Sequence, residues 1–195
     1  MDFKNSKTMT NLMNSFAGES QARNRYTFFS SVARKAGYQQ IAAIFQDTAD
    51  NEKEHAKVFY KLLVKYLGDA GAVVDVNATY PVVLSDTLAH LNSSIEGENE
   101  EWSKLYPEAA QIAKEEGFLD VAESFEQVAE AEKEHENRYQ ALKDNIENGT
   151  VFKKEVPVKW RCRNCGRVIE DAEAPETCPT CNHPQGYFEL LAENY

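Results

Sequence analysis

The sequence predicts an all-α four-helix bundle followed by a small metal-binding domain built from β-strands and loops. Two observations predict the bundle: apolar residues recur at every third or fourth position in four long segments, and the second segment resembles the fourth. One observation predicts the small domain, because all four cysteines lie within twenty residues as two Cys-x-x-Cys pairs. We therefore expect a bundle over residues 1–149, a linker over 150–158 and the small domain over 159–195.

The expected helices span residues 6–36, 38–67, 85–116 and 118–149. Glycines stand at their ends, at positions Gly37, Gly68, Gly117 and Gly149. We expect Ser85 to cap the third helix and Pro107 to kink or split it. Residues 69–84 show no helical period, and a connection of that length fits a bundle with one long crossover. Alternating apolar residues over 150–160 indicate an extended strand that leads into the small domain.

The tetrapeptide Glu-Lys-Glu-His occurs twice, at Glu52–His55 and Glu132–His135, and each copy lies on the apolar seam of its predicted helix. The segments that end in these copies, 37–55 and 117–135, share eight of nineteen residues without a gap. Glu and His three residues apart lie on one helix face, about 4.5 Å apart along its axis, so each pair can bind one metal ion. The repeat therefore predicts two similar helical hairpins.

A glutamate on the first helix of each hairpin completes this pattern, since Glu19 and Glu98 precede the repeated Glu-x-x-His pairs by similar distances. Four carboxylates and two imidazoles would then meet in the core, where uncompensated charge is strongly unfavourable. Two cations bridged by carboxylates would neutralise them, and oxygen-rich ligation with one imidazole per ion favours iron or manganese. The alternatives are pairing with buried basic residues, of which these seams carry few, or a rotated seam that leaves the carboxylates in water.

Glu101 breaks the symmetry of the repeat, because its counterpart three residues after Glu19 is Ala22. We expect Glu101 to be a seventh ligand, bound to ferric iron and exchanged for His55 when the iron is ferrous. The alternative is a residue that hydrogen-bonds to a ligand without touching the metal.

The cysteines Cys162, Cys165, Cys178 and Cys181 form two turns that can complete a tetrahedral thiolate site. Their spacing suits a zinc ribbon as well as a single-iron rubredoxin site, and disulfides are the third alternative. The N-terminal Met-Asp-Phe-Lys is charged and no long apolar run occurs. We therefore expect a reducing, cytoplasmic location, where clustered cysteines more often hold metal.

Charge and motif content exclude other functions. A net charge of −11 argues against nucleic-acid binding, which requires a basic face. Arg161, Arg163 and Arg167 form a local basic patch that suits an acidic electron donor or is simply solvated. We find no glycine-rich dinucleotide motif, so we expect electrons to come from another protein.

Together these motifs resemble the rubrerythrin family over nearly the whole chain. The residues that carry the resemblance are Phe16–Tyr26, the two Glu-x-x-His pairs, Gly97–Glu101 and Lys159–Gly166. The resemblance implies a ferritin-like bundle, a rubredoxin-like domain and a di-iron site with ligands Glu19, Glu52, His55, Glu98, Glu101, Glu132 and His135. It implies a third iron on the four cysteines, with zinc substitution possible. Tyr26 and Tyr106 match tyrosines that hydrogen-bond near the di-iron site in the family, whereas Trp102 stands where we expect tyrosine.

The resemblance also implies a function, reduction of hydrogen peroxide to water at a non-haem di-iron site. Electrons would return singly through the Fe(SCys)₄ centre from an NAD(P)H-linked reductase or rubredoxin. The family further implies a head-to-tail homodimer or larger homo-oligomer. Two alternatives stay open: an oxygen-reducing ferroxidase in the manner of ferritins, and a zinc-ribbon adaptor on a structural bundle.

Overall fold

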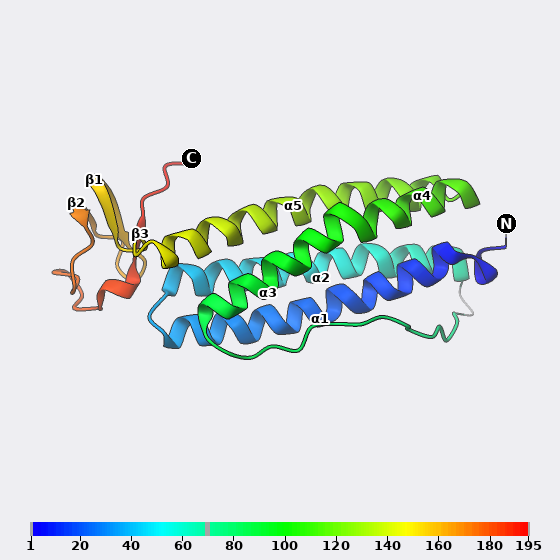
Figure 1. The fold of residues 1–195 in the computed structure, drawn as a ribbon, viewed down its shortest axis with the longest axis horizontal. Coiled ribbons are helices and arrows are strands. Elements are labelled where there is room, and N and C mark those ends of the chain that lie inside the picture. The colour runs from blue at the N-terminus through cyan, green and yellow to red at the C-terminus, as the bar shows by residue number, and fades with distance from the viewer. Residues whose placement is uncertain (1, 69–70, 195) are drawn as a thin grey trace.

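The computed structural model describes residues 2–68 and 71–194. Within these ranges a four-helix bundle forms the larger part, and a three-stranded sheet with loops lies at one end of it (Figure 1). The helices are η1 (Phe3–Asn5), α1 (Lys7–Lys35), α2 (Gln39–Leu67), α3 (Thr87–Glu100), the π-helical turn η2 (Glu101–Leu105), α4 (Tyr106–Glu116), α5 (Leu119–Glu147) and η3 (Gln185–Tyr187). The strands are β1 (Lys153–Cys162), β2 (Val168–Glu173) and β3 (Phe188–Leu190). The predicted fold class is confirmed, with α3, η2 and α4 together forming one of the four rods.

The two hairpins turn in the same way, as the sequence repeat predicts. Gly37 and Gly117 both have a φ of +89°, a left-handed conformation that favours glycine. The residue after each glycine closes the turn: Tyr38 N donates to Ala33 O at 2.9 Å, and the equivalent Phe118 N donates at 2.8 Å to Ala113 O. The repeat therefore extends from the predicted metal ligands to the backbone of the turns.

The predicted cap of the third helix is wrong, whereas its predicted interruption near Pro107 is present. Asp86 rather than Ser85 caps it, because the Asp86 carboxylate accepts a hydrogen bond from Ala89 N at 2.8 Å. The helix is also interrupted by η2, directly before Pro107. Proline lacks an N–H and its ring displaces the carbonyl four residues earlier, here that of Ser103 inside η2. The split that Pro107 predicts is thus present as a π-helical turn on its N-terminal side.

The predicted crossover runs along α1 from one end of the bundle to the other (Figure 1). Its first two residues, 69 and 70, lie outside the described ranges, and residues 71–84 contain neither helix nor strand. Two hydrogen bonds tie the crossover to Asn14 of α1: Tyr80 Oη donates to its carbonyl at 3.0 Å, and Asn77 N donates to its side chain at 3.2 Å.

The bundle core is layered, with a polar layer between two apolar clusters. One cluster includes Phe59 and Phe125, and the other includes Phe29 and Phe45. Five ionisable side chains between them are at most 4 % exposed: Glu19, Glu52, Glu98, Glu132 and His135. The apolar clusters fix the helices on both sides of this layer, so the polar side chains are held at a constant spacing.

The small domain packs on the end of the bundle. Its antiparallel sheet has the order β2-β1-β3, and the fully buried Trp160 of β1 donates from Nε1 to Asp171 O at 3.0 Å. The strand expected over 150–160 is present as β1. An added Cβ at Gly186 would lie 2.0 Å from Gly37 O, so the domain contacts the α1–α2 turn directly. No described helix is long and apolar enough to cross a membrane.

Candidate metal centres

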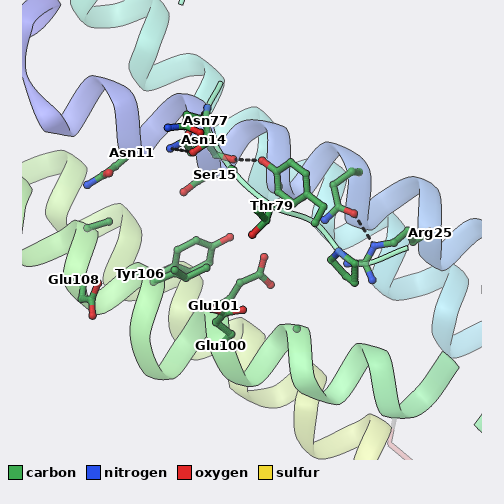
Figure 2. A pocket seen from close by; sticks show the side chains of 18 of the residues that line it. Asn11, Asn14, Ser15, Arg25, Asn77, Thr79, Glu100, Glu101, Tyr106 and Glu108 are labelled. Carbon is green, nitrogen blue, oxygen red and sulfur yellow. Dashed lines mark hydrogen bonds between the residues drawn. The ribbon is translucent and has the colours of Figure 1, made fainter. Parts of the chain in front are cut away.

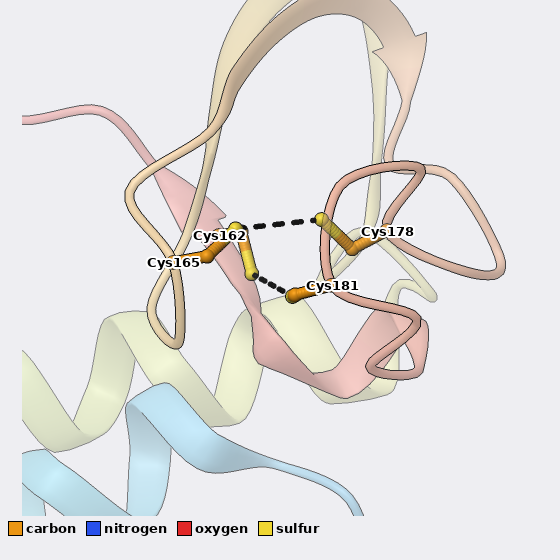
Figure 3. A group of neighbouring side chains, drawn as sticks. All are labelled: Cys162, Cys165, Cys178 and Cys181. Carbon is orange, nitrogen blue, oxygen red and sulfur yellow. Dashed lines mark hydrogen bonds between the residues drawn. The ribbon is translucent and has the colours of Figure 1, made fainter.

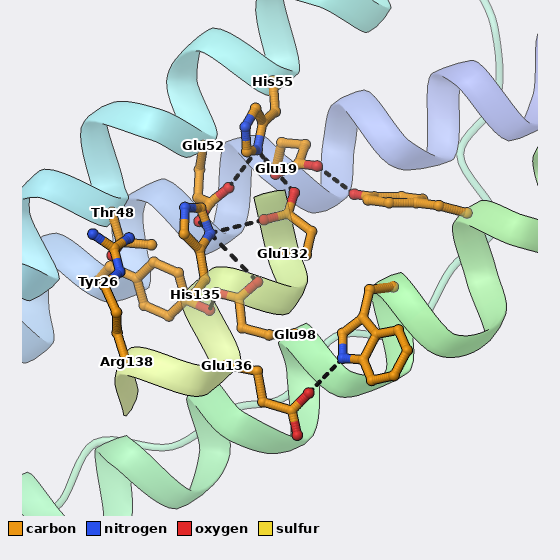
Figure 4. A network of polar contacts seen from close by, with 12 residues as sticks. Glu19, Tyr26, Thr48, Glu52, His55, Glu98, Glu132, His135, Glu136 and Arg138 are labelled. Carbon is orange, nitrogen blue, oxygen red and sulfur yellow. Dashed lines mark hydrogen bonds and ion pairs between the residues drawn. The ribbon is translucent and has the colours of Figure 1, made fainter. Parts of the chain in front are cut away.

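Six of the seven predicted bundle ligands come together in the polar layer (Figure 4). They form two overlapping groups, each with ligand atoms within 4.8 Å of one another: Glu19, Glu52, His55 and Glu132, and Glu52, Glu98, Glu132 and His135. Glu52 and Glu132 belong to both groups. A metal ion in each group would therefore share these two carboxylates as bridges.

The Glu-x-x-His spacing places each imidazole against the carboxylate of its own helix. His55 Nδ1 lies 2.9 Å from Glu52 Oε2, and His135 Nδ1 lies 2.8 Å from Glu132 Oε2. Each imidazole also reaches the opposite helix, with His55 Nδ1 2.8 Å from Glu132 Oε1 and His135 Nδ1 3.1 Å from Glu52 Oε1. The Glu-x-x-His pairs of α2 and α5 are thus related by an approximate twofold symmetry, which follows from the sequence repeat.

The chemistry of the polar layer fits a pair of cations. Several buried atoms have no hydrogen-bond partner in the described part of the chain: Glu19 Oε2, Glu52 Oε1, Glu98 Oε2, Glu132 Oε1, Glu132 Oε2 and His135 Nδ1. Some lie close to one another without the orientation that a hydrogen bond requires. Buried polar atoms are rarely left unsatisfied, and lone pairs that converge in this way are what a metal ion satisfies.

The pKa values of side chains in the polar layer show which protons a bound metal would displace. Burial, followed by the charge of Glu52, raises the pKa of Glu98 to about 8. Burial lowers the pKa of His55, but the carboxylates of Glu132 and Glu52, at 2.8 and 2.9 Å from Nδ1, outweigh it and raise that pKa to about 10. Burial also lowers the pKa of His135, but the carboxylates of Glu132 and Glu52, at 2.8 and 3.1 Å from Nδ1, raise it to about 12. The metal-free cluster therefore holds protons that metal binding must release.

The two tyrosines singled out in the sequence donate hydrogen bonds to carboxylates of the layer. Tyr26 Oη donates to Glu98 Oε1 at 2.6 Å, and the Tyr106 hydroxyl donates to Glu19 Oε1. Burial raises the pKa of both phenols well above 10, so both remain protonated donors. Each tyrosine fixes one carboxylate that belongs to a single metal-ligand group.

Glu101 stands apart from the other predicted ligands, since among the described residues neither group includes it. It begins η2 and faces a cavity beside the polar layer (Figure 2). Its Oε1 lies 4.0 Å from the position that a Cβ on Gly18 would take. Burial, followed by the charge of Glu98, raises its pKa well above 4.5. Its metal ligation stays a prediction.

The sequence analysis missed Glu136. The Trp102 indole donates to Glu136 Oε2 (Figure 4). Asn99 Nδ2 lies 3.2 Å from both oxygens of the same carboxylate. Lys133, also on α5, places its Nζ 5.3 Å from the centre of the Trp102 ring. Trp102 follows Glu101 and Glu136 follows His135, so this pair joins η2 to α5 beside the metal site. In the sequence, Glu136 is marked only as a polar residue that directly follows a predicted ligand. Its contact with Trp102 can be recognised only once the π-helical turn is known.

The four cysteines form a third metal-ligand group, separate from the two in the bundle (Figure 3). The Sγ atoms of Cys162 and Cys181 are 3.8 Å apart, and those of Cys165 and Cys178 are 3.7 Å apart. These separations exceed the roughly 2.05 Å of a disulfide bond, whereas sulfurs at about 2.3 Å from one tetrahedral ion would be about 3.8 Å apart. All four are free cysteines, so the structure contradicts the disulfide alternative.

Equivalent turns present the two cysteine pairs. Gly166 N donates to Cys162 O and Asn182 N donates to Cys178 O, both at 2.9 Å. Gly166 and Asn182 both have positive φ, and asparagine tolerates this conformation better than most residues. The backbone N–H of His183 helps to lower the pKa of Cys181 to about 6, so that thiol ionises readily for a metal.

The predicted basic patch on this domain is partly neutralised. Arg163 Nη1 pairs with Glu189 Oε2, and Arg161 Nε lies 3.8 Å from Glu189 Oε1. β3 therefore supplies a carboxylate that sequence reasoning had not placed beside these arginines.

Fold and sites together define a di-iron carboxylate helical bundle joined to a rubredoxin-like four-cysteine domain. The family model described as Rubrerythrin matches residues 10–143, and the one described as Rubrerythrin, rubredoxin-like domain matches residues 160–189. The chain therefore belongs to the rubrerythrin family. As members of this family bind iron, the chain has a di-iron carboxylate site and a four-cysteine iron site, and the latter implies electron transfer.

Relatives match along almost the entire chain. The chain is 56 % identical over 193 residues to a rubrerythrin of Clostridium perfringens and 46 % identical over 193 residues to a rubrerythrin of Nitratidesulfovibrio vulgaris, with 98 % of each chain covered. A mixed-valence structure of nigerythrin is 30 % identical with a TM-score of 0.64, covering 98 % of this chain and 94 % of that one. A bacterioferritin of Desulfovibrio desulfuricans, 22 % identical with a TM-score of 0.66 over 74 % of this chain and 82 % of its own, shares the fold.

Proposed function

We propose that this protein is a peroxidase that reduces hydrogen peroxide to two waters at the carboxylate-bridged site. The observation that carries the proposal is that Glu52 and Glu132 belong to both ligand groups, so two ions would be held as a pair. Two ferrous ions held there would supply two electrons at once and open coordination positions. With two protons from solvent, these two electrons would reduce hydrogen peroxide to two waters without release of a hydroxyl radical.

The side chains of the two groups have different roles in holding the two ions. Glu52 and Glu132 would bind both ions. His55 and Glu19 would complete the coordination of one ion, and His135 and Glu98 would complete that of the other. These six roles are proposals that rest on the two groups of converging ligand atoms.

Two further kinds of residue assist the ligands. The protonated hydroxyls of Tyr26 and Tyr106 hold the carboxylates of Glu98 and Glu19 by hydrogen bonds. Glu101 has a raised pKa and faces the cavity, so it can carry a proton to a leaving oxygen. Exchange of Glu101 with His55 on one ion according to oxidation state remains part of the proposal.

Electrons would arrive through the four-cysteine centre. The small domain contacts the α1–α2 turn, and Glu19 lies about 24 Å before the end of α1 at 1.5 Å per residue. Electron transfer slows steeply with distance, so we propose that the small domain of a second chain serves each di-iron site in a head-to-tail homodimer. The external donor would be rubredoxin or an NAD(P)H-linked reductase, in the cytoplasm.

The test compares two oxidants. Anaerobically reduced protein is mixed with hydrogen peroxide or with dioxygen in a stopped-flow instrument, and oxidation of both centres is followed by absorbance. We expect hydrogen peroxide to oxidise the di-iron site faster than dioxygen at equal concentration. Faster oxidation by dioxygen would favour a ferroxidase instead.

A further inference from the structure

A cavity of about 350 Å³ lies between α1, the crossover and the α3–η2–α4 rod (Figure 2). Its inner end is lined by Glu101 and by Tyr106, whose hydroxyl contacts the carboxylate of Glu19. Gly18 and Gly97 also line it, directly before the predicted ligands of α1 and α3. A Cβ on Gly97 would meet no described atom within 4 Å. The cavity therefore reaches the edge of the metal site, where the absence of side chains leaves room.

The cavity is much larger than hydrogen peroxide requires. One water occupies about 30 Å³ of liquid, so a molecule of two heavy atoms would fill only about a sixth of 350 Å³. Sites for small organic molecules begin at about 300 Å³. The available volume therefore fits a substrate with several carbon atoms.

The lining carries polar as well as apolar side chains. Leu105, Ala109 and Ile112 of η2 and α4 and Pro81 of the crossover offer apolar contacts, whereas Asn11, Gln21 and Arg25 of α1 offer polar ones. Glu101 and Tyr106 lie next to the metal site. A peroxide group directed at them would leave a compact carbon group in contact with the apolar side chains.

We propose that this cavity is a substrate chamber that admits small organic hydroperoxides as well as hydrogen peroxide. The proposal rests on the peroxidase function and extends its substrate class. Reduction breaks the O–O bond of ROOH and forms the alcohol ROH and water. The two electrons come from the reduced protein, replenished singly by the same external donor, and the two protons come from solvent.

The test fills the chamber from two sides. Ser15→Leu adds an apolar side chain from α1, and Ala78→Phe adds one from the crossover, which has no helix to disrupt. Ser31→Leu is the matched control, because Ser31 is an exposed residue of the same helix and does not line the cavity. All three are assayed as iron-loaded protein with hydrogen peroxide and with tert-butyl hydroperoxide.

We expect the unaltered protein and the Ser31→Leu control to reduce both peroxides. In both filled variants, kcat/KM for tert-butyl hydroperoxide should fall at least about tenfold, and that for hydrogen peroxide should change less than about threefold. Equal losses for the two peroxides, or no loss for tert-butyl hydroperoxide in either filled variant, would overturn the proposal. An unaltered protein that reduces hydrogen peroxide but not tert-butyl hydroperoxide would also overturn it.

A binding measurement separates this proposal from the peroxidase function. The methyl resonance of tert-butyl alcohol, the product, should broaden when oxidised iron-loaded protein is added, because the chamber brings it close to paramagnetic iron. The broadening should persist with Ser31→Leu and disappear with Ser15→Leu and Ala78→Phe. Equal broadening by all four proteins contradicts the chamber. A protein that reduces neither peroxide contradicts the peroxidase function, whatever the broadening shows.

Discussion

Glu132 approaches the imidazoles of His55 and His135 and belongs to both ligand groups. Glu132→Ala should therefore remove both ions rather than one, because each would lose a bridging carboxylate and the remaining buried charges would repel. Metal content by plasma emission spectrometry should fall from about three irons per chain to about one. Glu134→Ala is the matched control, an exposed glutamate two residues further along the same helix, and should retain all three. Two irons left in Glu132→Ala would show that Glu132 does not bridge.

The stability of the metal-free protein should depend on pH through the same side chains. The pKa of His55 rises from 6.5 to about 10 on folding, so its contribution is complete below pH 6.5 and is lost as pH rises through 10. Burial raises the pKa of Glu98 from 4.5 to about 8, which also makes folding less favourable as pH rises. The Tm measured by calorimetry should thus fall between pH 7 and pH 10. Iron-loaded protein should show a smaller fall, because metal replaces the protons, and a constant Tm in metal-free protein would contradict this account.

At the scale of single elements, η2 depends on a side-chain contact with α5. A π-helical turn has poorer backbone hydrogen-bond geometry than an α-helix, and the bond from Trp102 to Glu136 ties this turn to α5. Trp102→Phe keeps an aromatic ring but removes the donor, so it should lower the free energy of unfolding by about 1 kcal/mol. Amide hydrogen exchange should accelerate in residues 101–105 and remain unchanged in α1.

Trp102→Phe has a matched control in Glu134→Gln, which alters an exposed carboxylate near Glu136 without touching the indole. The control should leave exchange in η2 unchanged. Unchanged exchange in Trp102→Phe as well would mean that the backbone holds η2 without this bond.

Regular helix geometry explains how far the sequence predicted these elements. The Glu-x-x-His spacing placed His55 and His135 correctly, because three residues along an α-helix always share a face. The same spacing did not bring Glu101 into either ligand group, although it follows Glu98 by three residues, and Glu101 is the residue at which the π-helical turn begins. Ser85 and Asp86 are both good capping residues, and only the direction of the incoming crossover decides between them. Regular elements were therefore predictable, and irregular ones required the tertiary structure.

At the scale of the whole molecule, the sequence predicted both centres but not their separation. Helix seams identify residues that face a common core, and cysteine turns identify a local site. The position of the small domain depends instead on a close backbone contact between Gly186 and Gly37, which no periodicity reveals. The chamber depends likewise on where residues 77–81 of the crossover pass over α1.

The contact at Gly186 gives a prediction about domain docking. Gly186→Ala would place a Cβ 2.0 Å from Gly37 O, so the small domain must shift away from the bundle. Trypsin should then cleave more rapidly near Lys153 and Lys154, while the four-cysteine absorbance remains unchanged because the thiolate turns lie elsewhere. Gly71→Ala, in the crossover, is the control and should not affect cleavage there. Equal cleavage of Gly186→Ala and the unaltered protein would show that the domain docks without this contact.

The separation of the two centres gives a prediction about electron flow. Cys162→Ser removes one thiolate of the four-cysteine site, whereas the conservative Thr180→Ser in the second turn keeps all four. Cys162→Ser should lose peroxide reduction driven by an external donor and NADH, because single electrons no longer enter. After chemical pre-reduction it should still complete one round of peroxide reduction, since the ligands of the bundle are intact. Loss of that single round would show that the two centres are not independent.

A mixture of two inactive variants then distinguishes transfer within a chain from transfer between chains. Glu132→Ala keeps the four-cysteine site and Cys162→Ser keeps the bundle site, so a co-expressed mixed dimer contains one intact centre of each kind on different chains. Donor-driven turnover should return in the mixed dimer if the small domain of one chain serves the bundle of the other. Absence of turnover in a mixed dimer that retains both metals would place electron transfer within one chain, along the last 16 residues of α1, about 24 Å at 1.5 Å per residue.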